Sequence, residues 1–572
     1  MFNILKIQYK TRGKGMKMKK TSLFGVIAVC GVVLSACGSG SGTTDGSSAA
    51  GGSGKEADKQ EFRVSVLQEM PSADLSLATD TISFTALNNV YEGIYRLDKD
   101  SKPVPAGAAE EAKVSEDGLK YTIKLREDAK WSDGTPVKAS DYVFAWQRTV
   151  DAKTASEYAY LYEPVVNAAD ITAGKKDKSE LGIKAVNDYE LEITLTRPTP
   201  YMDYLFAFPS FFPQPQKVVE KNGDKFATKS ENSVYNGPFV LAGFDGPGTD
   251  TEWEYKKNDT YWDKDTVKLD AVKVSVVKES STGLNLFNDG QTDDAILTGE
   301  LAQQNANQEA FQSVKEARTS YLELNQRKED SPFMNEDLRL AISYAIDRNA
   351  IVNSVLGDGS VASTGLIPSD MSKNPETNED FTKEAGDLVS FDAKKAKDHW
   401  EKAKKALGKD SFTFDIVASD DDGTKKVLEY LQSTLEETLS GIKIKPTPVP
   451  FSVRLDRSNN GEFDMVLGGW GADYSDPSSF TDLFVTGNSY NRGQWSNEEY
   501  DKVVKESNTT NAGDPMKRWA NLQEADKIIS STAGVIGVFQ KAEGHMINPK
   551  VKGIVHHAAG ASWDYKWTYV TE

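Results

Sequence analysis

Cysteine is nearly absent from this sequence of 572 residues, which holds only Cys30 and Cys37. Cys30 lies within an apolar run near the N-terminus, and Cys37 directly follows that run. The rest of the chain has no thiol. This composition excludes a disulfide framework and a cysteine-based metal site in the main body of the protein.

Histidine and catalytic motifs are also scarce. The four histidines are His399, His545, His556 and His557, and none belongs to an H-E-x-x-H pattern. Adjacent side chains on a strand point in opposite directions, so His556 and His557 cannot readily share a metal ion. The sequence has neither a P-loop nor a G-x-S-x-G elbow. We therefore expect no metal and no cofactor, and the sequence gives no support for an enzyme.

Basic residues are outnumbered: 67 lysines and arginines face 86 aspartates and glutamates, which gives a net charge of −19. A nucleic acid is therefore excluded as a natural partner, because its phosphates would be repelled. Beyond the N-terminal segment there is no second long apolar run, so we expect no transmembrane helix.

Residues 1–36 have the pattern of a secretory signal peptide. Lys17, Lys19 and Lys20 precede an apolar run over 23–36, which is too short to span a bilayer. Residues before Met16 add nothing that a signal needs, so translation that starts at Met16 or Met18 fits the pattern as well as Met1.

The apolar run ends in Leu34-Ser35-Ala36-Cys37, which resembles the lipobox of bacterial lipoproteins. This resemblance implies cleavage before Cys37 and acylation of that residue, so that lipid chains hold the protein on the outer face of the cell membrane. Residues 37–59 are rich in Gly, Ser and Ala, which predicts a flexible tether between the anchor and the folded protein.

Strands alternate with helices along the main body, which favours an α/β fold. The clearest helix is predicted over 335–356, where Asn335 can cap the N-terminus and Gly357 can end the helix. A strand is predicted over 321–325. Further helices and strands alternate from 392 to 467.

A glycine-rich stretch from Gly468 to Pro477 follows a short apolar strand. Its three glycines allow another backbone to approach closely, and Trp470 supplies a flat wall. Asp473 lies among them, and its carboxylate either caps local structure or binds a cation. Asp476 before Pro477 fits the capping role better. These residues alone leave both roles open for Asp473, and we favour the binding of a cation.

Six short sequence motifs occur together and in a fixed order along the chain. They span residues 91–93, 129–136, 142–148, 236–239, 338–342 and 469–474. With them the chain from about residue 60 resembles the oligopeptide-binding proteins of peptide ABC transporters, in their lipid-anchored form. The resemblance implies a two-lobed periplasmic-binding-protein-like α/β fold with an extra subdomain and a two-strand hinge. It places the first lobe at 60–91, 216–315 and 541–572, the extra subdomain at 92–215, and the second lobe at 316–540.

The same resemblance implies which residues contact a peptide. Asp473 matches the carboxylate that pairs with the α-ammonium, and Gly469 and Gly471 match positions whose backbone binds the peptide main chain around Trp470. The other implied contacts are the segment Thr79, Asp80 and Thr81, the pocket residues Tyr158 and Glu323, and Phe451 in place of a tryptophan of some relatives.

Two departures qualify the resemblance. Leu467 occupies a position where some relatives have an arginine that grips the carboxylate end of a short peptide, so a preference for tripeptides is not expected. Relatives with a pocket disulfide have cysteines where this chain has Gly471 and Arg318, so that bridge cannot form.

The sequence thus predicts a monomeric receptor that delivers oligopeptides to the transmembrane permease of an ABC transporter. Three alternatives stay open: a receptor for one signalling peptide, a binder of a non-peptide solute, and a surface hydrolase.

Overall fold

The computed structural model of the chain describes residues 55–572. The predicted signal peptide, the lipidation site Cys37 and residues 38–54 of the predicted tether lie outside the described residues. Residues 55–59 differ from the expectation of a tether: Glu56 forms a β-bridge with Thr571, and the Ala57 amide donates to the Val570 carbonyl. Within 55–572 no helix is both long and apolar enough to cross a membrane.

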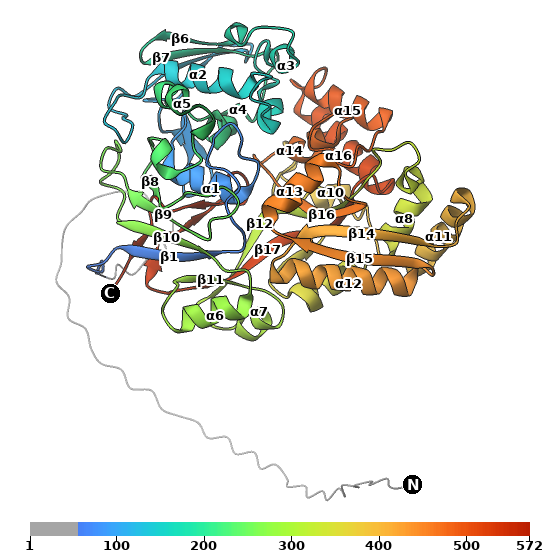
Figure 1. Cartoon of the computed structure of the whole chain (residues 1–572). Coiled ribbons are helices and arrows are strands. Elements are labelled where there is room, and N and C mark those ends of the chain that lie inside the picture. The colour runs from blue at the N-terminus through green and yellow to red at the C-terminus, as the bar shows by residue number, and fades with distance from the viewer. Residues whose placement is uncertain (1–54) are drawn as a thin grey trace, which may run out of the picture. The chain divides into compact units, whose positions relative to one another are not determined.

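Two long strands run through the centre of the fold, β12 (Phe311–Leu324) and β17 (Ile536–Ile547). They belong to one large sheet with the strand order β15-β14-β16-β12-β17-β11-β1-β10-β9-β8. β12 pairs with β17 over most of its length, and the second part of β12 also pairs with β16 on its other side. Both strands therefore pass from one half of the protein to the other, as the predicted two-strand hinge requires (Figure 1).

The first lobe surrounds the half of the sheet that contains β1. There β1 and β10 are parallel neighbours, and helices α6 and α7 lie beside β11 (Figure 1). Its elements are β1 (Glu61–Val66), α1 (Thr81–Val90), β8 (Phe239–Ala242), β9 (Glu252–Lys257), β10 (Ala271–Val276), α6 (Ser280–Asn288), β11 (Asp294–Leu297) and α7 (Glu300–Asn305).

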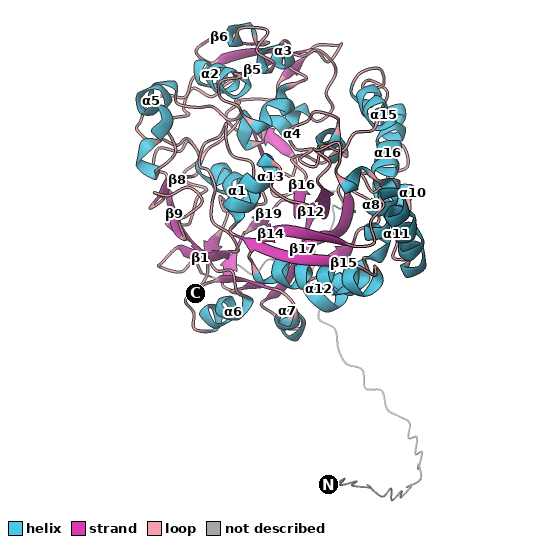
Figure 2. Cartoon of the chain, turned by 45° about the vertical axis from the view of Figure 1, so that its right-hand side comes forward, coloured by secondary structure: helices cyan, strands magenta, loops and turns pink. Residues whose placement is uncertain are grey.

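The second lobe has its own apolar core, in which buried side chains of α8, α11 and α12 pack against β14, β15 and β16. Figure 2 shows these helices on the outside of the strands. The elements are α8 (Glu336–Ala345), α11 (Ala393–Leu407), β14 (Phe412–Ser419), α12 (Asp422–Thr438), β15 (Ile442–Val449), α13 (Phe451–Asn460), β16 (Met465–Gly471), α14 (Ser478–Thr481), α15 (Glu498–Asn508) and α16 (Pro515–Ser531).

The extra subdomain is built on a separate sheet with the order β4-β5-β7-β6. Its elements are β4 (Lys113–Val114), β5 (Lys120–Lys124), α2 (Ala139–Val150), the 3-10 helix η1 (Glu157–Tyr162), α3 (Ala168–Thr172), β6 (Ile183–Asn187), β7 (Glu190–Thr194) and α4 (Met202–Phe206). Helix α5 (Gln216–Asn222), which the resemblance assigns to the first lobe, lies beside α2 (Figure 1). The two-lobed α/β fold is thus as predicted, whereas the residue boundaries of its parts stay predictions.

Two predicted elements need correction. The helix expected over 335–356 begins as predicted, because the Asn335 side chain accepts a hydrogen bond from the Leu338 amide. It ends at Ala345, since Ile346 adopts an extended conformation, and a one-turn helix and a π-helix follow up to Gly357. The strand expected over 321–325 is the end of β12, which begins ten residues earlier at Phe311.

Candidate functional site

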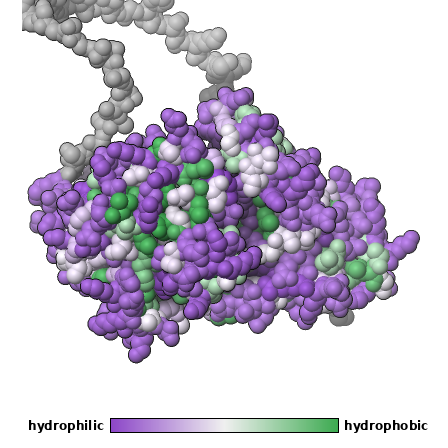
Figure 3. Space-filling view, turned by 90° about the horizontal axis from the view of Figure 1, so that it is seen from above, coloured by the Kyte–Doolittle hydropathy of each residue, from purple (hydrophilic) through white to green (hydrophobic). Residues whose placement is uncertain are grey.

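A cavity lies between the two lobes and the extra subdomain. Its walls come from the end of β1, the start of α1, η1, the middle of β12, the start of α13, the end of β16 and the middle of β17. These segments are up to about 480 residues apart in the sequence and meet only in the folded protein. Outside the cavity, the face of the molecule seen in Figure 3 is mainly hydrophilic.

One wall of the cavity is the exposed edge of β16. This strand pairs with β12 along its whole length, but it pairs with β14 only at Met465 and Val466. From Leu467 onward its other edge has no strand partner among the described residues. An unpaired strand edge offers main-chain donors and acceptors to an extended ligand.

The hydrogen-bond pattern shows which residues of β16 direct their main-chain N–H and C=O groups toward this open edge. The amide of Ala472, the residue after β16, donates a hydrogen bond to the carbonyl of Ala317 in β12. In an antiparallel pair, successive residues direct their main-chain groups alternately toward and away from the partner strand. Gly469 and Gly471 therefore direct theirs away from β12, toward the open edge. This agrees with the main-chain role that the sequence analysis expects of both.

Asp473 lies just beyond the end of β16, and its side chain is buried, with 6% exposed. Its two carboxylate oxygens accept hydrogen bonds from the hydroxyls of Tyr158 (3.1 Å) and Tyr160 (3.3 Å), both on η1. Within residues 55–572 no lysine or arginine forms an ion pair with it. Asp473 thus bridges the second lobe and the extra subdomain and has no cation at its side.

Burial raises the pKa of Asp473 to about 8, although the two tyrosine hydroxyls and the charge of Arg318 act in the opposite direction. A buried carboxylate whose charge is so poorly compensated would gain strongly from a cationic partner. Asp476 contrasts with it: Arg518 binds both of its oxygens at 2.7 Å and, despite burial, holds its pKa below the usual value. Asp476 also accepts from the amide of Ser478, the first residue of α14, although the N-cap position of that helix is Pro477.

Aromatic rings enclose the region around Asp473. The ring of Trp470 stacks on Tyr158 at a centroid distance of 6.0 Å and meets the edge of Tyr490 at 4.6 Å. The indole N–H of Trp470 is buried and has no hydrogen-bond partner among the described residues. The region thus combines apolar ring faces with an unpartnered indole N–H and a carboxylate that has no cationic partner among the described residues.

The segment Thr79, Asp80 and Thr81 lines the same cavity. Asp80 caps α1, because its carboxylate accepts from the Ser83 amide at 2.8 Å. Its other oxygen is buried without a partner in the described structure, and burial raises its pKa to about 6. The hydroxyl of Thr81 accepts from Arg318 at 2.9 Å. Asp80 is thus a helix cap as well as a wall residue.

Of the two remaining residues that were predicted to contact a peptide, one lines the cavity and the other does not. Phe451, the first residue of α13, lines the cavity. Glu323 does not: its side chain is 2% exposed and accepts from the Gly493 amide at 3.0 Å. Glu323 is therefore a buried residue behind the cavity wall. The prediction for Glu323 was wrong because both faces of β12 are buried at this position, and only one of them faces the cavity.

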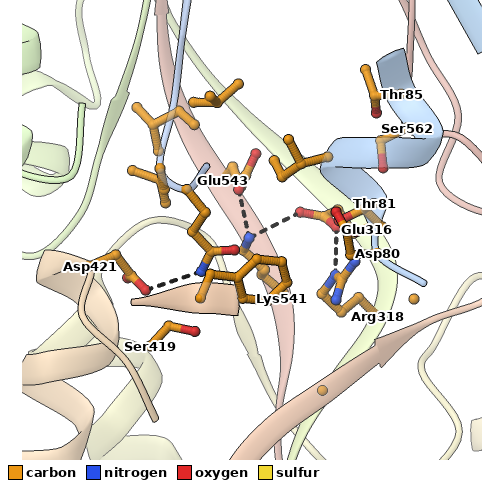
Figure 4. Close-up of a pocket in the computed structure, with 18 of the residues that line it drawn as sticks. Asp80, Thr81, Thr85, Glu316, Arg318, Ser419, Asp421, Lys541, Glu543 and Ser562 are labelled. Carbon is orange, nitrogen blue, oxygen red and sulfur yellow. Dashed lines mark hydrogen bonds and ion pairs between the residues drawn. The ribbon is translucent and has the colours of Figure 1, made fainter. Parts of the chain in front are cut away.

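A row of charged side chains, which the sequence analysis did not single out, forms the floor (Figure 4). Lys541 of β17 pairs with Glu543 at 2.6 Å and with Glu316 of β12 at 3.6 Å, and Arg318 pairs with Glu316 at 3.0 Å. Charged residues at alternate positions of β17 were the available signal, because such residues share one face of a strand. His545 continues this face and pairs with Asp294 and Glu543.

Comparison with known proteins identifies the family of the chain. The sequence profile of the bacterial extracellular solute-binding proteins, family 5, matches residues 102–492. The chain belongs to this family. Its members are solute-binding proteins. Within residues 55–572 no group of three or more His, Cys, Asp or Glu side chains is arranged to hold a metal ion.

Individual solute-binding proteins are similar over nearly their whole length. The dipeptide-binding protein of Lactococcus lactis subsp. cremoris is 36% identical, and the match covers 97% of this chain and 100% of the relative. The structure of Listeria monocytogenes OppA bound to peptide superposes with a TM-score of 0.87 at 41% identity, and that of the pheromone receptor PrgZ with 0.86 at 39%. Each covers 90% of this chain and 100% of the neighbour.

Proposed function

We propose that this solute-binding protein captures oligopeptides between its lobes and passes them to the permease of an ABC transporter. The observation that carries the proposal is the open edge of β16 beside the buried carboxylate of Asp473, which has no cation in the described structure. The names of the relatives support the same ligand class, since they include dipeptide- and oligopeptide-binding proteins.

The chemistry of such a site is independent of peptide sequence. Main-chain pairing along Gly469 and Gly471 recognises any extended peptide, and the ammonium at Asp473 fixes its register. A charge-assisted hydrogen bond gains strength in a buried environment, and Trp470, Tyr158 and Tyr490 are all buried. The protein would bind and release its ligand without making or breaking a bond.

The proposal extends to the cellular setting. The lipobox-like sequence at Cys37 supports a lipid anchor, which would hold the protein as a monomer on the extracellular face of the cell membrane. From there a tether would let the folded part reach its transporter. A lipoprotein that works beside its permease needs no second membrane segment.

A second candidate function is the recognition of one signalling peptide, which the likeness to the pheromone receptor PrgZ favours. Native mass spectrometry of the purified protein separates the two candidates. A mixture of bound peptides supports nutrient uptake, whereas a single bound peptide supports signalling.

The test of peptide capture compares a free tetra-alanine peptide with its N-acetylated form by isothermal titration calorimetry. We expect acetylation to weaken binding at least 100-fold, because it removes the charge that Asp473 would pair with. Equal binding of both forms would overturn the proposed role of Asp473. Binding of neither, together with tight binding of a non-peptide solute, would overturn peptide capture, and recovery of cleaved peptide would indicate a hydrolase.

A further inference from the structure

Arg454 is a buried cation in the wall of the cavity. It lies in the first turn of α13, is 7% exposed and lines the cavity beside Phe451 and Leu467. Its side chain forms no ion pair and donates no hydrogen bond to any described residue, and its Nε is buried without a partner. Its one specific contact is with the ring of Phe451, whose centroid is 4.9 Å from the guanidinium carbon.

The other arginines of this wall are different. Arg318 pairs with Glu316 at 3.0 Å and donates to Thr81, while Arg492 donates to the Asn459 side chain at 2.8 Å. Burial, followed by the charge of Arg492, lowers the pKa of Arg454 to about 10, so it still carries its charge at neutral pH. A buried charge is costly unless it is paired, and an aromatic face compensates for only part of that cost.

The position of Arg454 along β16 is informative. Its Nη1 lies 3.6 Å from the place that a Cβ of Gly468 would occupy, so the missing side chain at Gly468 leaves room for the guanidinium. Gly468 precedes Asp473 by five residues. At a rise of about 3.3 Å per residue this corresponds to roughly 16 Å, the length of an extended peptide of about four or five residues.

We propose that Arg454 is an anion subsite that binds a carboxylate of the ligand and thereby determines specificity. The proposal rests on the proposed function, in which Asp473 holds the α-ammonium. A peptide that lies antiparallel to β16 would then bring its other end to Arg454. The guanidinium would receive either the C-terminal carboxylate or an acidic side chain at the fourth or fifth position, a contact that carboxylates favour in planar, two-pronged geometry. It would supply from α13 the basic group that Leu467 lacks.

The experiment measures dissociation constants by isothermal titration calorimetry for alanine peptides of three to six residues, each with a free or an amidated C-terminus. Two further amidated peptides carry glutamate at position four or five. The variants are Arg454→Gln and, as the matched control, Arg457→Gln. Arg457 belongs to the same helix but pairs with Asp415 and does not line the cavity.

We expect amidation to weaken binding to the wild-type protein tenfold or more at four or five residues. The Arg454→Gln variant should bind the free peptide as weakly as the wild type binds the amide, and Arg457→Gln should behave as wild type. If glutamate in an amidated peptide restores affinity, the subsite takes a side chain. If only a free terminus does, it takes the C-terminal carboxylate. Both results support the subsite.

The proposal is overturned if amidation and added glutamate change the wild-type affinity less than threefold at every length. That comparison uses only the wild-type protein, so it tests the anion subsite even if the Arg454→Gln variant does not fold. Tight binding of free and amidated peptides alike would leave peptide capture standing and remove only the subsite. Binding of no peptide at all would remove both.

Discussion

Replacing Asp473 by Asn should move stability and affinity in opposite directions. The substitution keeps the size and planarity of the side chain and removes its charge. The hydroxyls of Tyr158 and Tyr160 can reorient to bond the amide, since a tyrosine hydroxyl both donates and accepts. The main change is therefore electrostatic.

The stability effect follows from the pKa of Asp473, which burial raises from the ordinary 3.8 to about 8 in the folded protein. Below pH 3.8 the group is protonated in both the folded and the unfolded state and costs nothing. As the pH rises toward 8, the unfolded state is favoured increasingly, because only there is the carboxylate readily ionised. At pH 7 the penalty is roughly 4 kcal/mol, at about 1.4 kcal/mol per pH unit.

The ligand-free Asp473→Asn variant should therefore be more stable than the wild type at pH 7, with a melting temperature several degrees higher. The difference should shrink toward pH 5. Its peptide affinity should fall roughly 150- to 5000-fold, because leaving one buried charge without its partner costs about 3–5 kcal/mol. Differential scanning fluorimetry on ligand-stripped protein and calorimetry with a free tetra-alanine peptide measure the two effects.

Asp476→Asn is the matched control. Asp476 is also buried, but Arg518 binds it at both oxygens, so its loss should lower the melting temperature and leave peptide affinity nearly unchanged. If Asp473→Asn instead lowered stability and bound peptide as well as wild type, Asp473 would be a structural residue and the reasoning would be refuted.

Three further predictions concern the proton, the glycines and the anchor. In the ligand-free protein Asp473 is largely protonated at pH 6, so peptide binding at that pH should release close to one proton. At pH 9.5 the peptide amine should instead take up a proton on binding. Calorimetry in buffers of different ionisation enthalpy measures both numbers, and no proton release or uptake at any pH would contradict the ion pair. Gly469→Ala should lower the melting temperature, because the added Cβ would lie 3.0 Å from the Thr319 carbonyl oxygen, which belongs to the backbone of β12. Gly471→Ala should lower it less, because its Cβ meets only the end of the long Arg318 side chain; equal effects would argue against this packing. Cys37→Ser should abolish incorporation of labelled palmitate in growing cells and shift the protein into the medium, and continued labelling would rule out Cys37 as the acylated residue.

Local patterns in the sequence determined much of the fold. Asn335 was predicted to cap a helix and does so, and the alternation of strands and helices from 392 to 467 is present as β14, α12, β15, α13 and β16. These features depend on residues within a few positions of one another, so the sequence reports them directly. The break after Ala345 was missed because the following residues have the composition of a helix and are bent away by their packing.

The glycines around Trp470 suggested that another backbone approaches there, and the resemblance to oligopeptide-binding proteins assigned Gly469, Gly471 and Asp473 to a peptide site. The sequence could not decide which buried side chains face the cavity. Glu323 and Arg454 are both charged and both nearly inaccessible, yet Glu323 lies behind the wall and Arg454 lines it. That difference depends on which face of a strand or helix the two lobes cover, and this is fixed only when segments hundreds of residues apart pack together.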